Sequence, residues 1–187
     1  MLMYKRYFLL SLILFFLHTS VFAAENIVFY LIGEQKASEI NTIKRYFEKK
    51  KFKVNIFSLV GQVDRHLDNI NKINSLKASM LIAFNIEITD SEGCFIAIYN
   101  PPIKPGRFKA IEEAPGFYGA ESKNLAGAIA SSFNVRVKEI PLFPLIGLDM
   151  PSVFVNIQTH KDGINLAFDK LYSGIENYLK RGKKDER

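Results

Sequence analysis

Apolar, β-branched runs alternate with helical patterns along this chain, and this alternation constrains the fold most strongly. Residues 26–32 (NIVFYLI) and 78–86 (ASMLIAFNI) are nearly uninterrupted apolar runs, as expected of strands covered on both faces. In residues 150–160 (MPSVFVNIQTH) the pattern alternates instead, so that valine and isoleucine share one face. The opposite face carries Phe154, Asn156 and Gln158, which puts neutral amides where an apolar strand is about to end.

Further segments complete the alternation. Shorter strand patterns and amphipathic helical patterns occupy the remaining chain. The predicted strands are 53–60, 93–99 and 135–140, and the predicted helices are 37–52, 63–77, 124–133 and 163–180. Because parallel strands need crossover helices, we predict an α/β three-layer sandwich: a mixed, mostly parallel sheet with helices on both faces. A site in such a sheet lies at the carboxyl ends of the strands, here residues 32–34, 85–87 and 156–160.

The first 23 residues are typical of a secretory signal peptide. A basic start with Lys5 and Arg6 precedes a ten-residue apolar run, 8–17, which is too short to span a bilayer. Small residues then precede an expected cleavage after Ala23. We therefore predict an exported protein, periplasmic or secreted, that is not an integral membrane protein once the leader is removed. Residues 24–180 are expected to form one domain, and residues 181–187 a charged tail.

The charge pattern bears on partners. Loss of the leader lowers the formal net charge from +6 to +4, because it removes two basic residues and no acidic one. Basic residues concentrate in 44–53 and 180–187, a pattern that fits solvated helix surfaces and also an anionic polymer or membrane surface. The chain has no glycine-rich phosphate loop, and we expect no nucleic-acid partner.

Few residues outside the strand ends offer reactive chemistry. Two histidines follow the leader, His66 and His160, and both are expected to face solvent. Cys94, the only cysteine, lies within a strand pattern and is expected to be a small buried side chain. These residues give no credible nucleophile–base arrangement.

A long segment interrupts the alternation at 100–122. It holds four prolines and three glycines and has no clean period, which is typical of a lid or rim. The aromatic side chains in or beside it offer surfaces that stack on sugars, although loop aromatics more often pack the loop itself. These residues are Tyr99, Phe108, Phe117 and Tyr118.

The order of several segments resembles the zinc-dependent N-acetylmuramoyl-L-alanine amidases of the cell wall. PLFPLIGLDMPSVFVN (141–156) is similar to the closing segment of that family, in which a Met-Pro-(Ala/Ser)-Val-Leu-Val-Glu strand follows a Leu-x-Val-Leu run. NKINSLKASMLIAFNI (71–86) is similar to its helix-to-strand segment, which ends in Ser-Ile-His. SKNLAGAIASSF (122–133) is similar to its Ser-x-x-Leu-Ala helix. The resemblance covers roughly residues 26–179 and implies the amidase fold.

The functional positions of the family are replaced here. The resemblance puts the two metal-binding histidines at Gly33 and Asn85, and the catalytic glutamate at Asn156. The metal-binding glutamate of the family corresponds to Glu34 or Glu39, and the short connection leaves that choice open. Asn156 thus looks like the shape-conserving remnant of a general base.

These replacements predict an inactive protein. A catalytic zinc ion needs about three ligands from His, Cys, Asp and Glu, and a carboxamide has no useful basicity. We therefore expect no zinc, no catalytic residue, and an exported amidase-fold protein that binds peptidoglycan or an envelope protein. The candidate binding residues are Asn85, Asn156, Gln158 and Glu34; at the two asparagines, simple hydrogen bonding to local backbone or water is the favoured alternative.

Two other functions stay open. An active amidase with a rebuilt site would need Glu34 or Glu39 to converge with His160 and with Asp162 or Glu87. An exported α/β domain that binds a small ligand at the strand ends would explain the architecture without the family.

Overall fold

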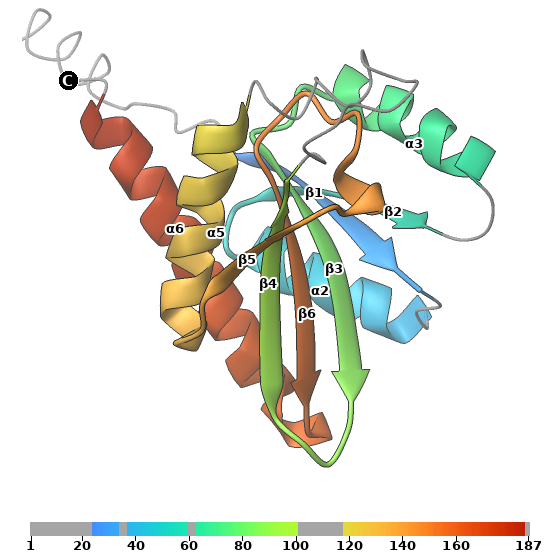
Figure 1. Ribbon diagram of the computed structural model, residues 1–187. Helices are drawn as coiled ribbons and strands as arrows, with labels where there is room; N and C mark the ends of the chain where they lie inside the picture. Colours follow the sequence, from blue (N-terminus) through green and yellow to red (C-terminus); the bar gives the residue numbers. More distant parts are fainter. Residues whose placement is uncertain (1–23, 34–36, 60–62, 101–117, 186–187) are drawn as a thin grey trace, which may run out of the picture.

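The computed structural model describes residues 24–33, 37–59, 63–100 and 118–185. These residues form six strands, four α-helices and two short 3-10 helices (Figure 1). The strands are β1 (Asn26–Ile32), β2 (Lys53–Leu59), β3 (Met80–Ile88), β4 (Gly93–Tyr99), β5 (Val137–Ile140) and β6 (Ser152–Thr159). The helices are α2 (Ala37–Lys49), α3 (Val63–Ser75), α5 (Gly119–Phe133), α6 (Ile164–Asp185), η2 (Phe143–Leu145) and η3 (Lys161–Gly163).

The strands form one mixed sheet in the order β2-β1-β3-β6-β4-β5. The first four strands in this order are mutually parallel, β4 runs antiparallel to β6, and β5 is parallel to β4. The predicted α/β class with a mixed, mostly parallel sheet is confirmed.

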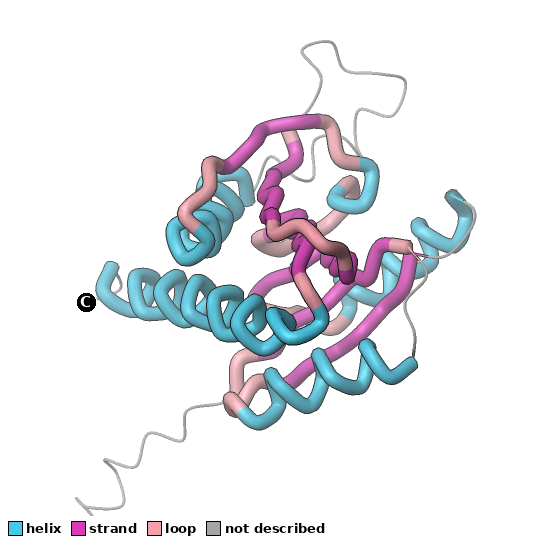
Figure 2. The backbone as a smooth tube through the Cα atoms, turned by 90° about the horizontal axis from the view of Figure 1, so that it is seen from below, coloured by secondary structure: helices cyan, strands magenta, loops and turns pink. Residues whose placement is uncertain are grey.

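Helices cover both faces of the sheet, as the tube in Figure 2 shows. On one face, α2, α5 and α6 bury residues such as Phe47, Leu125 and Phe168 against the strands. On the other face, α3 and the segment around η2 pack over a smaller cluster that includes Tyr30, Ile73 and Leu145. Both faces of the central strands are therefore buried against apolar side chains, which accounts for the nearly continuous apolar sequences of these strands.

Helix α5 begins at Gly119, five residues before the predicted start, so residues 119–122, predicted to be irregular, are helical. The buried Ser122 hydroxyl accepts a 3.0 Å hydrogen bond from the backbone N–H of Ser152, which ties the first turn of α5 to the start of β6. The local sequence, with its glycines, contains no sign of this tertiary bond.

Several further boundaries differ from the prediction by a few residues, and two of them have a local explanation. Strand β5 begins at Val137, because Asn134 ends α5 in the left-handed conformation and the Val135 N–H still bonds to Ala130. Helix α6 continues to Asp185, into the predicted tail, because helical bonding continues past the last buried turn.

The prediction that His66 faces solvent is wrong. The side chain of His66 is only 1% exposed, whereas its neighbour Leu67 is 43% exposed. The buried stripe of α3 consists of His66, Ile70 and Ile73. His66 can lie inward because its imidazole packs against the rings of Tyr30 and Phe143. His160 is exposed, as predicted, and Cys94 is only partly buried.

The predicted signal peptide lies outside the described residues. Among the residues that are described, no helix is both long enough and apolar enough to cross a membrane.

Candidate functional site

Four polar side chains lie together at the carboxyl ends of two neighbouring strands. Asn85 and Glu87 on β3 are in register with Asn156 and Gln158 on β6. Spacings of two residues put all four on one face of the sheet, the face that α3 covers further toward the amino ends of the strands. All four are half-buried. We call this group the amide–carboxylate row.

Hydrogen bonds join the whole row. Asn85 Nδ2 donates to Glu87 Oε1 at 2.8 Å and to Asn156 Oδ1 at 2.9 Å. Gln158 Nε2 donates to Glu87 Oε2 at 3.0 Å. Each oxygen of the Glu87 carboxylate thus accepts from a different amide, so that Glu87 joins the Asn85–Asn156 pair to Gln158.

Aromatic surface borders the row along β4 and β6. Phe95 pairs directly across from Asn156 and is 38% exposed. Its ring meets that of Phe154 edge-on at a centroid distance of 6.1 Å. Opposite Gln158 stands Gly93, which has no side chain, so this end of the row is bordered only by backbone. Polar groups with an adjoining apolar ledge suit a ligand that has both hydrogen-bonding groups and apolar faces.

Gly33 follows β1 and has a φ of +83°. A positive φ favours glycine over residues with a side chain. Space is not the constraint, because a Cβ at this position would meet no atom within 4 Å. The backbone conformation therefore accounts for the presence of glycine at position 33. Glu34, the adjoining candidate, lies outside the described residues.

Glu39 does not join the row. It lines a hollow of about 350 Å³ between α2, β3 and α6, whose walls include Ile86 and Ile88. Because successive strand residues point to opposite faces, these isoleucines and Glu39 lie across the sheet from Glu87.

His160 and Asp162 are exposed at the turn after β6, and His160 precedes η3. Across the described part of the chain, no three His, Cys, Asp or Glu side chains gather closely enough to hold a metal ion. The convergence that a rebuilt metal site requires is therefore not found among these residues.

The aromatic residues proposed for sugar stacking divide into two groups. Tyr99 is partly buried and packs against the α3-side cluster, and Tyr118 is the residue immediately before α5. Phe108 and Phe117 lie outside the described residues.

Sequence reasoning underrated Glu87, which it considered only as an acid for a rebuilt site. The sequence contains one sign of its place in the row: Asn85-x-Glu87 and Asn156-x-Gln158 have the same spacing of two residues. This spacing indicates a shared site only when β3 and β6 are known to be neighbouring strands.

Comparison with known proteins identifies the architecture. No protein-family model and no curated protein matches the chain. Among solved structures, the N-acetylmuramyl-L-alanine amidase Ami1 from Mycobacterium smegmatis aligns with a TM-score of 0.53 at 14% identity, over 85% of this chain and 99% of that one. The catalytic domain of the CD27L endolysin targeting Clostridia difficile aligns with a TM-score of 0.53 at 13% identity, over 82% and 97%.

A third structure, the apo form of Ami1 from Mycobacterium abscessus, gives a TM-score of 0.52 at 12% identity, over 84% and 99% of the two chains. The chain has the amidase fold. The fold expected from the sequence resemblance is thus confirmed, at an identity too low to carry function with it.

The described residues of this amidase-fold chain do not fit a catalytic zinc ion. Such an ion takes about three ligands from imidazole, thiolate and carboxylate groups. At the strand ends the row offers one carboxylate, already bonded to two amides, and neutral carboxamides. Gly33 offers no side chain. Neutral amide oxygens compensate poorly for removing water from a dication.

Proposed function

We propose that this chain is a non-catalytic amidase-fold protein of the cell envelope that binds peptidoglycan through the amide–carboxylate row. The observation that carries the proposal is the bonded set of Asn85, Glu87, Asn156 and Gln158 at the carboxyl ends of β3 and β6. In an α/β sheet this is the edge where ligands bind.

The chemistry of the row favours binding over hydrolysis. Asn156 stands where the resemblance expects a general base, and an amide takes no proton from water at neutral pH. Amide groups both donate and accept hydrogen bonds, as the peptide bonds and hydroxyl groups of a sugar–peptide polymer also do. Phe95 and Phe154 add an aromatic ledge for the apolar face of a sugar ring.

A basic surface supports an envelope role. The first basic segment of the sequence, 44–53, meets α6 at Lys50, close to Lys180 of the second segment. Lys50 Nζ lies 4.6 Å from the ring centroid of Tyr172, and one turn further along α6 Glu176 pairs with Lys180 at 2.8 Å. Several exposed lysines around this junction favour attraction to an anionic envelope polymer.

A co-sedimentation experiment tests the proposal. The exported chain is mixed with purified, insoluble peptidoglycan, and bound protein is measured together with released stem peptide and protein-bound metal. We expect binding without cleavage and without stoichiometric zinc. Replacing Asn156 and Gln158 together by alanine should weaken binding at least about tenfold, since two ligand hydrogen bonds are lost.

The control is Asn71→Ala, which removes an exposed amide of α3 away from the row. Its binding should equal that of the wild-type chain. Cleavage with stoichiometric zinc would establish an active amidase instead. If the chain fails to bind peptidoglycan at all, the proposed function is wrong.

A further inference from the structure

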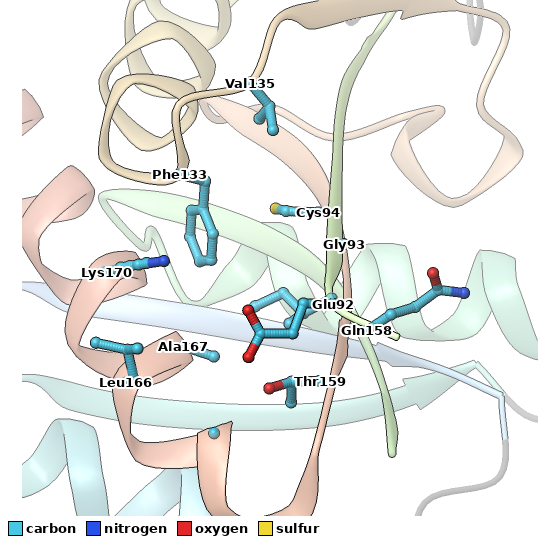
Figure 3. A pocket seen from close by; sticks show the side chains of 12 residues that line it. Glu92, Gly93, Cys94, Phe133, Val135, Gln158, Thr159, Leu166, Ala167 and Lys170 are labelled. Carbon is cyan, nitrogen blue, oxygen red and sulfur yellow. The ribbon is translucent and has the colours of Figure 1, made fainter. Parts of the chain in front are cut away.

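A second hollow lies on the opposite face of the sheet from the amide–carboxylate row. It measures about 270 Å³ and opens where α5, α6, β4 and β6 meet. Figure 3 shows Cys94 and Thr159 on its side of the strands, whereas the Gln158 side chain projects away on the other side. Gln158 of the row thus also borders the hollow, but the hollow opens on the face of the sheet opposite the row.

The floor and one wall of this hollow are apolar. Ile157 and Ala167 are almost fully buried there, at 2% and 6% exposure. Phe133, Val135 and Leu166 complete the wall, and Leu166 is 57% exposed. An exposed leucine beside a hollow is apolar surface that an aliphatic group would cover favourably.

Two opposite charges border this apolar floor. Lys170 extends into the hollow from α6, and Glu92 extends into it from the residue just before β4 (Figure 3). Within the described residues neither side chain forms an ion pair, and the ammonium of Lys170 lies 5.9 Å from the Phe133 ring centroid. The hollow thus presents one cation and one anion that are both available to a ligand.

Cys94 adds no reactive chemistry. Burial raises the pKa of its thiol to about 12, and the nearby charge of Lys170 only partly opposes this effect. A thiol in that state is a poor nucleophile and metal ligand near neutral pH, so the hollow suits reversible binding.

From these features we infer that the hollow binds a small aliphatic zwitterion of the α-amino-acid type. Lys170 receives the carboxylate, Glu92 receives the ammonium, and the floor around Ile157 receives the side chain. The volume is slightly below the roughly 300–1,000 Å³ of sites for drug-sized ligands, which limits the occupant to about one residue. This binding is independent of the proposed peptidoglycan function.

The test is calorimetric titration of the intact exported chain with L-leucine, N-acetyl-L-leucine and L-leucinamide. The three probes share a side chain, and the last two each lack one charge. We expect leucine to bind at least about tenfold more tightly than either derivative, since a hydrogen bond to a charged group contributes roughly that factor. Leucyl-leucine tests the size limit: it should bind more weakly than leucine, and tighter binding would contradict the assignment to a single amino acid.

Variants place the site. Lys170→Met removes the partner of the carboxylate and should abolish the preference for leucine over leucinamide. Glu92→Gln removes the charged partner of the ammonium and should abolish the preference for leucine over N-acetyl-leucine. Lys138→Met, on exposed β5, should change neither preference. Thermal unfolding confirms that each variant folds, and peptidoglycan co-sedimentation should be unaltered in all three.

Equal affinity for the three probes would overturn the inference, because it would show that the hollow binds only through its apolar surface. Failure of the folded chain to bind leucine at millimolar concentration would overturn it as well. Loss of the preferences in Lys138→Met would likewise contradict it.

Discussion

Asn85 donates a 2.9 Å hydrogen bond to Asn156 across the β3–β6 pair, and this direction is set by Glu87. The Glu87 carboxylate can only accept, so it orients the Nδ2 group of Asn85 toward itself and toward Asn156 Oδ1. The two asparagines, although chemically identical, therefore have opposite roles.

Because Asn85 donates and Asn156 accepts, replacing each asparagine by aspartate should affect stability to a different extent. Asn85→Asp replaces a donor by a carboxylate that faces two acceptors, and should destabilise the fold by about 1–3 kcal/mol at pH 7. Asn156→Asp keeps the acceptor that Asn85 requires and should cost clearly less. Urea unfolding of both variants measures the difference. Equal losses would show that the donor assignment is wrong.

The buried His66 predicts a loss of stability in acid. Its Nδ1 lies 2.8 Å from the Tyr30 hydroxyl, and no described residue makes a hydrogen bond of ordinary geometry to its Nε2. Burial lowers the pKa of His66 from 6.5, and the Ile146 backbone opposes part of the shift. The unfolded chain then binds more protons just below pH 6.5, so the free energy of unfolding falls as the pH drops through that range.

The slope from this residue is at most about 1.4 kcal/mol per pH unit. His66→Phe keeps a ring against Phe143 and should flatten the dependence between pH 7.5 and 5.5, as measured by urea unfolding at each pH. The matched control is His160→Phe, at an exposed position, which should leave the slope as it is. An unchanged slope in His66→Phe would count against the buried site.

The close approach of α5 and α6 predicts a sensitive glycine. A Cβ at Gly174 would lie 2.5 Å from Ile129 Cα and 3.1 Å from the Ala128 carbonyl oxygen, both backbone atoms. Gly174→Ala should therefore force the helices apart and destabilise the chain by about 1–3 kcal/mol. Thermal unfolding measures this loss.

Gly127 provides the control for this helix pair. It lies within α5, and a Cβ there would meet no atom within 4 Å. Gly127→Ala should stabilise the chain by about 0.5–1 kcal/mol, because alanine loses less backbone entropy in a helix. Destabilisation by both substitutions would argue against steric contact as the cause.

The Cys94 thiol predicts slow chemical labelling. With a pKa raised by burial to about 12, its thiolate fraction at pH 8 is far below that of an exposed cysteine. Modification by a disulfide reagent should be at least about a hundredfold slower in the native chain than in urea. Comparable rates in both states would contradict the partial burial of this side chain.

Part of the architecture is readable from local patterns. The run 26–32 and the segment 93–99 are strands with the predicted limits, because a β-branched, apolar segment flanked by polar turns has few other ways to bury itself. The alternation in β6 likewise predicts that Val153, Val155 and Ile157 are buried while Asn156 is partly exposed. These properties depend on short-range periodicity.

His66 and Ser122 show the limit of such reasoning. A polar residue on an amphipathic helix is expected to face water, yet His66 lies inward. Tyr30, far away in the sequence, bonds to its ring, and Phe143 packs against it. The start of α5 depends in the same way on Ser122 meeting β6. Neither partner can be inferred from helical periodicity.

The sequence by itself determined the alternating strands and helices and which face of each strand is apolar, since these follow from the free energy of burying apolar side chains at a period of 2 or 3.6. It also placed neutral amides at the strand ends. Only the tertiary structure decided that Asn85, Glu87, Asn156 and Gln158 share one hydrogen-bonded row, and that Lys170 and Glu92 border one hollow. Contacts between residues distant in sequence depend on strand order and helix packing, which local periodicity does not encode.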